Sequence, residues 1–239
     1  MEIGKAFSFV TEDEQWITKV LIGGLIQIVP LLGTIAILGY SYRVAQNVAR
    51  GHPRPLPAWG EFGDLLGRGF FVLIIQIVYL LPVIVIYGIF AFLTVAIAAV
   101  GGESDAGAAI AGLLALCLIP LILIAVLVCA GAGLAAAMRY LATDSFGEAF
   151  NFGEVIATLR RHIGSFLMIL VVSILAGLVA SLGVIACGVG VLFTGFYANC
   201  VIGHAIGQVM QRIFPPQQPV YAVPGVYGPP PGYGPPPSY

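Results

Sequence analysis

The chain has 239 residues, of which 59% are hydrophobic and only 9% charged, and its formal net charge is −1. Soluble domains carry about 25% charged residues, so this composition excludes a water-soluble enzyme and a disulfide-rich secreted module. The absence of a basic excess also excludes a nucleic-acid binder, because phosphate contacts require a positive surface. The composition predicts an integral membrane protein whose main partner is the lipid bilayer.

The first 19 residues mix charged, apolar and aromatic side chains. We predict that residues 1–19 form an interfacial segment that lies on the membrane before the first apolar run. Two lysines stand against four carboxylates here, so the charge balance leaves the side of the N-terminus open.

Residues 20–42 contain no charged side chain, and Pro30 and Gly33 stand at their middle. Proline removes a backbone donor and glycine loosens the helix, so the run is broken where a membrane span would be continuous. Two alternatives follow. The run is either a single kinked span or a re-entrant pair of half-helices that returns to the side from which it came.

The loop over residues 43–68 carries four arginines and three alternating prolines. Prolines stiffen an extended backbone, and tryptophan and phenylalanine anchor loops at the membrane interface. Pro57, Trp59 and Phe62 therefore form a candidate membrane-interface or partner-binding loop.

Four later apolar runs predict membrane-spanning helices over 70–100, 107–138, 163–182 and 186–211. Each reaches the roughly 20 residues that cross a hydrocarbon core. The uncharged stretch 163–211 must fold back near 182–190, where Gly183, Gly188 and Gly190 permit a turn. The predicted fold is an all-α, polytopic transmembrane helical bundle with interfacial amphipathic helices, a transmembrane domain over 20–212 and a tail over 213–239.

Basic residues concentrate in 43–68, in 139–162 and at Arg212, whereas 101–106 contains two acidic residues and no basic one. The positive-inside rule places the basic segments and the C-terminus in the cytoplasm and 101–106 outside. The chain is therefore expected to be a multi-pass protein of the cell membrane.

Polar residues are rare within the predicted spans. Those that could make intramembrane contacts are Gln27, Gln76, Cys200, His204 and Gln208, the last three at i, i+4 and i+8 on one helix face. His204 either contacts a ligand or relays a proton, or it forms hydrogen bonds between helices, as the other residues could. The sequence contains no catalytic, cofactor-binding or metal-binding motif, and we expect a protein that is not an enzyme and takes no cofactor.

Small residues recur at a spacing of four, as in Gly203 and Gly207, Gly177 and Ser181, and Ala132 and Ala136. Such faces allow helices to pack closely, either within one chain or in a homo-oligomer.

After Phe214 the chain is rich in proline and glycine and contains no charge. Tyrosines recur every six residues, at Tyr221, Tyr227, Tyr233 and Tyr239. Such a segment buries too little apolar surface to fold, so we expect a disordered tail with polyproline II character. Its repeated rings suit weak multivalent contacts with a cytoplasmic protein partner.

A set of aromatic, glycine and proline residues occurs in the first part of the chain: Trp16, the run Ile22-Gly23-Gly24, Gly39-Tyr40 followed by Arg43, then Gly51, Leu56, Pro57, Trp59 and Gly69. With these residues the chain resembles the uncharacterised prokaryotic membrane family called domain of unknown function 4013. The resemblance covers about residues 1–212, and its specific motifs lie in the first 90. The family implies a multi-span helical fold in bacteria and archaea, and no activity, substrate or catalytic residue.

Two functions from different classes fit these observations. The first is a non-enzymatic membrane protein that organises or recruits partners at the inner face through its loop and tail. The alternative is a transporter or channel for a small neutral or amphiphilic solute, which would use breaks at Pro30, Pro82 and Pro120.

Overall fold

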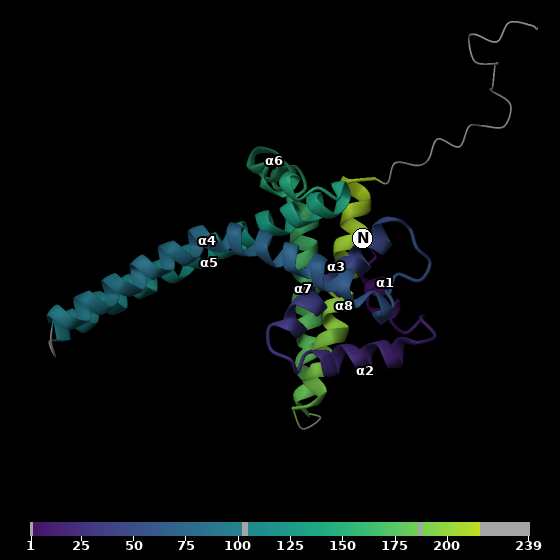
Figure 1. Cartoon of the computed structure of the whole chain (residues 1–239). Coiled ribbons are helices and arrows are strands. Elements are labelled where there is room, and N and C mark those ends of the chain that lie inside the picture. The colour runs from purple at the N-terminus through teal and green to yellow at the C-terminus, as the bar shows by residue number, and fades with distance from the viewer. Residues whose placement is uncertain (1, 102–104, 186–187, 216–239) are drawn as a thin grey trace, which may run out of the picture.

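The computed structural model describes residues 2–101, 105–185 and 188–215, and the described chain is helical throughout (Figure 1). Short helices begin the chain, and two long hairpins follow. The α-helices are α1 (Ile3–Ser8), α2 (Trp16–Ile26), α3 (Leu32–Ala49), α4 (Phe62–Gly101), α5 (Asp105–Thr143), α6 (Phe152–Arg161), α7 (Ile163–Ser181) and α8 (Gly190–Ile213). Short 3₁₀ turns cover Trp59–Glu61, Phe146–Phe150 and Leu182–Ile185.

Four helices in the described chain are long and apolar enough to cross a membrane. They comprise Trp59–Ile97, Leu118–Thr143, Ile163–Ile185 and Gly190–Ile213, and these segments correspond to the predicted spans. The prediction of an all-α, polytopic membrane fold is confirmed.

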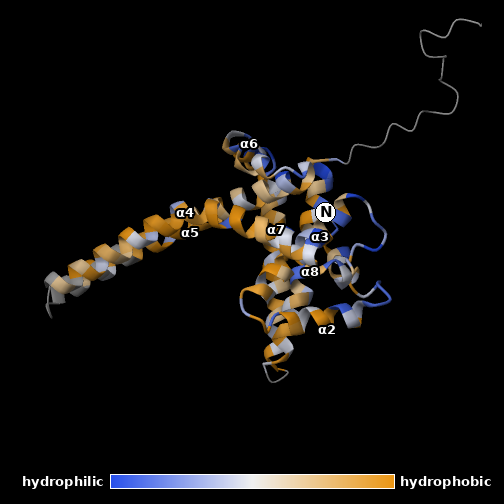
Figure 2. Ribbon diagram, viewed as in Figure 1, coloured by the Kyte–Doolittle hydropathy of each residue, from blue (hydrophilic) through white to orange (hydrophobic). Residues whose placement is uncertain are grey.

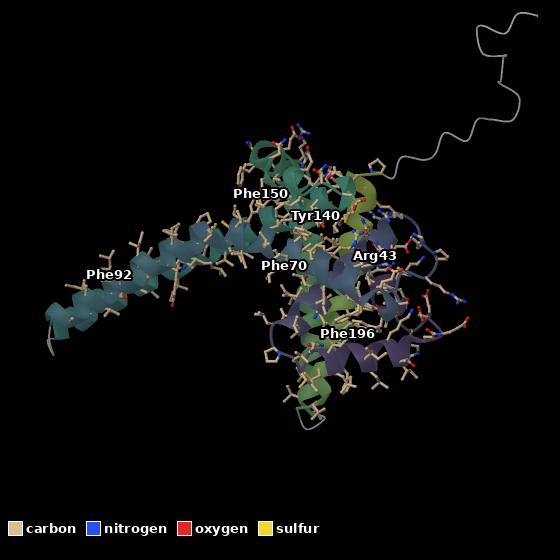
Figure 3. The ribbon with its side chains drawn as sticks, viewed as in Figure 1. Arg43, Phe70, Phe92, Tyr140, Phe150 and Phe196 are labelled. Atoms are coloured by element: carbon tan, nitrogen blue, oxygen red, sulfur yellow. The ribbon has the colours of Figure 1, made fainter. Side chains whose placement is uncertain are left out.

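The α4–α5 hairpin projects away from the rest of the molecule (Figure 1). Its helices have 40 and 39 residues, so each is about 60 Å long, roughly twice the thickness of a hydrocarbon core. Its outer part is apolar on the surface, and Phe92, which is 72% exposed, points away from the hairpin (Figures 2 and 3). Only a lipid environment accommodates so much exposed apolar surface without a further partner.

Residues 20–42 do not form one kinked helix. Helix α2 ends at Ile26, a turn follows, and α3 begins at Leu32. Pro30 cannot donate a backbone hydrogen bond, and Leu31 adopts a positive φ of 65° in a tight γ-turn closed by Leu32 N–H to the Pro30 carbonyl at 2.7 Å. The single kinked span is therefore wrong, and the broken pair of helices is the alternative that the structure contains.

Both ends of this helix pair meet the loop that follows α3. Lys19, in the first turns of α2, donates to the Leu56 carbonyl at 3.0 Å, and Asn47, near the end of α3, donates to the Pro55 carbonyl at 2.9 Å. The start of α2 and the end of α3 are thus tied to one loop.

Helix α3 lies between α4 and α8 and carries most of the packing at the centre of the bundle. At the α3–α4 crossing, a Cβ on Gly39 would overlap the Leu65 carbonyl, and a Cβ on Gly69 would overlap the Ile35 carbonyl. Glycine at both positions lets the two backbones touch.

Helices α3 and α8 pack closely along their length in the same way. A Cβ on Gly203 would overlap the Ser41 carbonyl, and one on Gly207 would meet Ala45 and Val48. The small-residue face of Gly203 and Gly207 is therefore used inside the chain. Ala132 and Ala136 are also buried within the core, whereas the Gly177 position on α7 has open space around it.

The α7–α8 hairpin turns where the glycines predict it. Gly188 has a φ of 78°, a left-handed conformation that glycine adopts without strain, and α8 begins two residues later. The segment 1–19, predicted to be interfacial, contains α1 and the first residues of α2, and a 3₁₀ turn and α6 occupy the stretch from Phe146 to Arg161. In the latter, the Asn151 side chain caps α6 by accepting from Glu154 N–H at 3.4 Å.

Candidate functional site

Ion pairs join the basic loops that the sequence predicts on one side of the membrane. Asp144, which follows α5, lies 3.7 Å from Arg50 and 3.5 Å from Arg68. Arg43, labelled in Figure 3, lies 3.5 Å from Glu61 and belongs to the same polar region. The segments 43–68 and 139–162 therefore meet in the folded chain.

A buried glutamine connects this region, and the sequence did not single it out. Gln46 is 2% exposed, and its Oε1 accepts hydrogen bonds from Arg43 and Arg68, both at 3.1 Å. Its Nε2 donates to the Leu141 carbonyl at 3.1 Å, which ties α3 to the end of α5. The available signal was its spacing of three residues from Arg43, which places both side chains on one helix face.

An open cavity of about 440 Å³ lies where α1, the loop after α3 and the end of α8 meet. Its polar lining combines acidic, basic and amide side chains, which are Glu2, Lys5, Glu12, His52, His204, Gln208, Gln211 and Arg212. Because charges of both signs line one recess, its occupant would be polar and would itself carry mixed charge or several hydrogen-bonding groups. This polar cavity is the candidate functional site.

His204 lies at the wall of the polar cavity and is 4% exposed. The Phe9 ring packs against its imidazole with centroids 4.4 Å apart, and Gln208 Nε2 lies 3.1 Å from His204 Nδ1. An amide nitrogen can only donate, so Nδ1 accepts and the proton of the neutral ring is on Nε2. A protonated imidazole would lose this hydrogen bond.

The remaining polar residues predicted in the spans do not gather at the polar cavity. Gln27 donates to the Leu192 carbonyl at 2.7 Å, and Gln76 donates to the Tyr42 hydroxyl at 3.1 Å. Leu192 precedes His204 by twelve residues of α8, which is about 18 Å along the helix axis. Cys200 is buried in the core beside Phe196 and does not line the polar cavity. These contacts join helices to one another.

The loop predicted to lie at the membrane interface packs against the bundle. The Trp59 ring stacks on Tyr40 at 4.7 Å and lies 5.8 Å from Phe196, and its Nε1 donates to the Lys19 carbonyl at 3.1 Å. The Pro57 carbonyl accepts from the buried Tyr40 hydroxyl at 3.0 Å. Phe62 is the exposed member of the three. The geometry thus gives Pro57 and Trp59 internal contacts.

A short ion pair fixes the chain before α2. Lys19 Nζ donates to Asp13 Oδ2 at 2.7 Å, and Gln15 N–H donates to Asp13 Oδ1 at 2.8 Å. Burial raises the pKa of the Asp13 carboxyl, but these two hydrogen bonds, together with the positive charges of Lys19 and Arg54, outweigh it and leave the pKa below its usual value.

In the part of the chain that the structure describes, no three His, Cys, Asp or Glu side chains stand close enough to hold a metal ion. The predicted tail tyrosines, Tyr221, Tyr227, Tyr233 and Tyr239, lie outside the described residues.

A family model described as a protein of unknown function, DUF4013, matches residues 22–189, which is more than half of the chain. The chain belongs to this family. The resemblance seen in the sequence named the same family, over the wider range 1–212. Searches of curated proteins and of solved structures find no match.

Only some of the residues that line the polar cavity lie within the segment that the DUF4013 model matches. The loop residues His52, Pro53 and Pro55 lie within the matched segment, whereas α1 and the whole of α8 lie outside it. The DUF4013 segment therefore contains the end of α2, helix α3 and the helices from α4 to α7, whereas α8, which carries His204, follows it.

Proposed function

We propose that the chain is a non-enzymatic scaffold of the cell membrane that recruits a protein partner at the cytoplasmic face. The observation that supports this proposal is the position of the polar cavity. Arg212 lines it, α8 ends one residue later, and the sequence continues into the Pro- and Tyr-rich tail. A partner held by the tail would meet the polar cavity first.

The orientation of this face rests on charge. The segments 43–68 and 139–162 meet through the ion pairs of Asp144, and the loop residue His52 lines the polar cavity together with Arg212. Basic residues near span ends are retained on the cytoplasmic side, so we place this face and the C-terminus in the cytoplasm.

The chemistry of the site favours a peptide partner. The polar cavity offers carboxylates, ammonium and guanidinium groups, and amides within one recess, and a polypeptide presents complements to all of them. The tail adds weak contacts whose effects multiply through effective concentration. The two sites together would hold a partner that neither holds alone.

In-cell chemical crosslinking of the full chain, followed by quantitative mass spectrometry, tests the proposal. Three variants are compared with wild type: deletion of 215–239, the cavity variant Lys5→Gln with Arg212→Gln, and the control Arg54→Gln. Arg54 is an exposed base outside the polar cavity. We expect the same partners to be depleted in the first two variants and retained in the control. An identical partner list in all four samples would refute recruitment by this face.

The alternative of a solute transporter is supported by one observation, that a histidine within a candidate span lines an open cavity. Solute flux into proteoliposomes tests it, with His204→Leu compared with Gln76→Leu. Transport through the polar cavity predicts that only the His204 variant lowers flux. Equal flux in both variants and in wild type would dismiss this path.

A further inference from the structure

An apolar groove of about 270 Å³ lies between α5 and α7, roofed by the end of α6. It is a separate feature from the polar cavity, and its walls are almost entirely hydrocarbon. Leu127, Gly131 and Leu134 form one wall, and Phe166, Leu167 and Leu170 form the other. Because both walls belong to candidate membrane spans, the groove opens toward hydrocarbon and not toward water.

The end of α6 carries two arginines next in the chain to residues that line this groove. Leu159 and Ile163 both line the groove, and Arg160 and Arg161 stand between them in the chain. Both arginines are exposed and end a helix whose Phe152 and Ile156 are also exposed. A helix with exposed apolar and basic residues is suited to the headgroup layer.

Most other arginines of the described chain pair with a carboxylate, whereas these two and Arg212 at the end of α8 do not. Arg43, Arg50, Arg54, Arg68 and Arg139 each lie within 4.0 Å of a carboxylate. Among the residues that the structure describes, Arg160 and Arg161 have no such partner. Two guanidinium groups without a carboxylate partner would attract an anion, and the neighbouring hydrocarbon groove would accept an acyl chain. A ligand that combines both would complement this part of the surface.

We propose that the groove between α5 and α7 binds one anionic phospholipid of the bilayer, with an acyl chain along the groove and the phosphate on Arg160 and Arg161. Charge complementarity identifies the headgroup, since guanidinium groups pair with phosphate oxygens in a bidentate geometry. The groove selects an acyl chain because no polar group of a peptide or solute would find a partner along its walls. The lipid would connect the projecting α4–α5 hairpin to α7.

Native mass spectrometry of the full chain in detergent tests the proposal. The protein is titrated with dioleoylphosphatidylglycerol and, separately, with dioleoylphosphatidylcholine, which carries the same acyl chains. Each basic residue near an anionic surface contributes about a fivefold gain, so two predict a preference for the anionic lipid of about 25-fold. Arg160→Gln with Arg161→Gln should lower that preference to about one, whereas the control Arg54→Gln with Arg212→Gln should retain it.

A second pair of variants tests the groove itself. At Gly131 a Cβ would already meet Leu159 Cδ1 at 3.2 Å, so Gly131→Leu fills the groove, whereas Gly177→Leu adds the same bulk to the open face of α7. We expect Gly131→Leu to weaken both lipids equally and Gly177→Leu to leave them unchanged. If the Gly131 variant does not fold, the lipid preference of the Arg160→Gln with Arg161→Gln variant decides the proposal.

The remaining outcomes overturn the proposal. Equal binding of the two lipids, or a preference that survives loss of both arginines, would show that these groups hold no headgroup. Displacement of the lipid by millimolar inorganic phosphate would show a free-anion site. A protein dimer that excludes lipid from the groove would show that a second copy occupies it.

Discussion

Gln208 holds the backbone of Glu2 through two hydrogen bonds that run in opposite directions. The Glu2 N–H donates to Oε1 at 2.8 Å, and Nε2 donates to the Glu2 carbonyl at 3.1 Å. The start of the described chain is thus tied to the last turns of α8. The same amide lies 3.1 Å from His204, so one side chain fixes two walls of the polar cavity.

Replacing this amide should release α1 from α8. Gln208→Leu removes both hydrogen bonds to Glu2, and we expect a loss of about 1–2 kcal/mol in the free energy of unfolding. Hydrogen–deuterium exchange in detergent should show faster exchange over residues 2–9. The control Gln211→Leu changes a glutamine that lines the same cavity. Equal exchange in the two variants would contradict the role of Gln208.

The glycine pair at the α3–α4 crossing should be intolerant of any side chain. Gly39→Ala places a methyl group against the Leu65 carbonyl, and we expect a loss of about 1–3 kcal/mol or misfolding. Gly67 precedes Gly69 by two residues and lies on the open face of α4. Gly67→Ala should therefore stabilise the helix by about 1 kcal/mol. The unfolding temperatures of the two variants are compared in detergent. A shift of the same sign in both would contradict the close contact of the two backbones at the α3–α4 crossing.

The Asp13–Lys19 ion pair predicts a dependence of local structure on pH. The pKa of Asp13 is lowered in the folded chain, so its contribution is present above the unfolded value of about 3.9 and is lost as the pH falls through the folded value. Trp59, whose indole donates to the Lys19 carbonyl, reports on it together with Trp16, the only other tryptophan.

Tryptophan emission should therefore stay constant from pH 7 to about pH 4 and change below it. Asp13→Asn should produce the low-pH spectrum already at pH 7. Glu14→Gln serves as the control, since Glu14 pairs with Arg54 on the exposed surface and such pairs contribute little. If Asp13→Asn gave the wild-type emission spectrum at pH 7, loss of the ion pair would not be the cause of the spectral change at low pH.

The four long helices were predictable because each contains a charge-free apolar run about as long as a hydrocarbon core is thick, or longer, and composition alone sets that property. The break at Pro30 was also visible. The path of the chain around this break stayed open between two alternatives, because contacts far away in sequence hold α2 in place: Gln27 donates to the Leu192 carbonyl and Gly23 packs on Phe196. Pairings across such separations leave no local pattern.

The candidate site was predictable only in part. His204 and Gln208 were visible as polar residues at helical spacing in an apolar run. Gln46 was not, because it follows an arginine in a stretch that reads as a polar loop, and only the folded chain buries it between Arg43, Arg68 and Leu141. The polar cavity itself joins residues from three separate segments, 2–12, 48–55 and 204–212, and no single segment indicates it.

Photo-crosslinking from single positions in the native membrane tests recruitment by the polar face most directly. A photoreactive amino acid is placed at Gln211, on the polar cavity, and in parallel at Phe92, on the exposed hairpin. The proposed function predicts a protein adduct from position 211 that disappears when 215–239 is deleted, and lipid adducts alone from position 92. The same protein adduct from position 92, with none from position 211, would contradict the proposal.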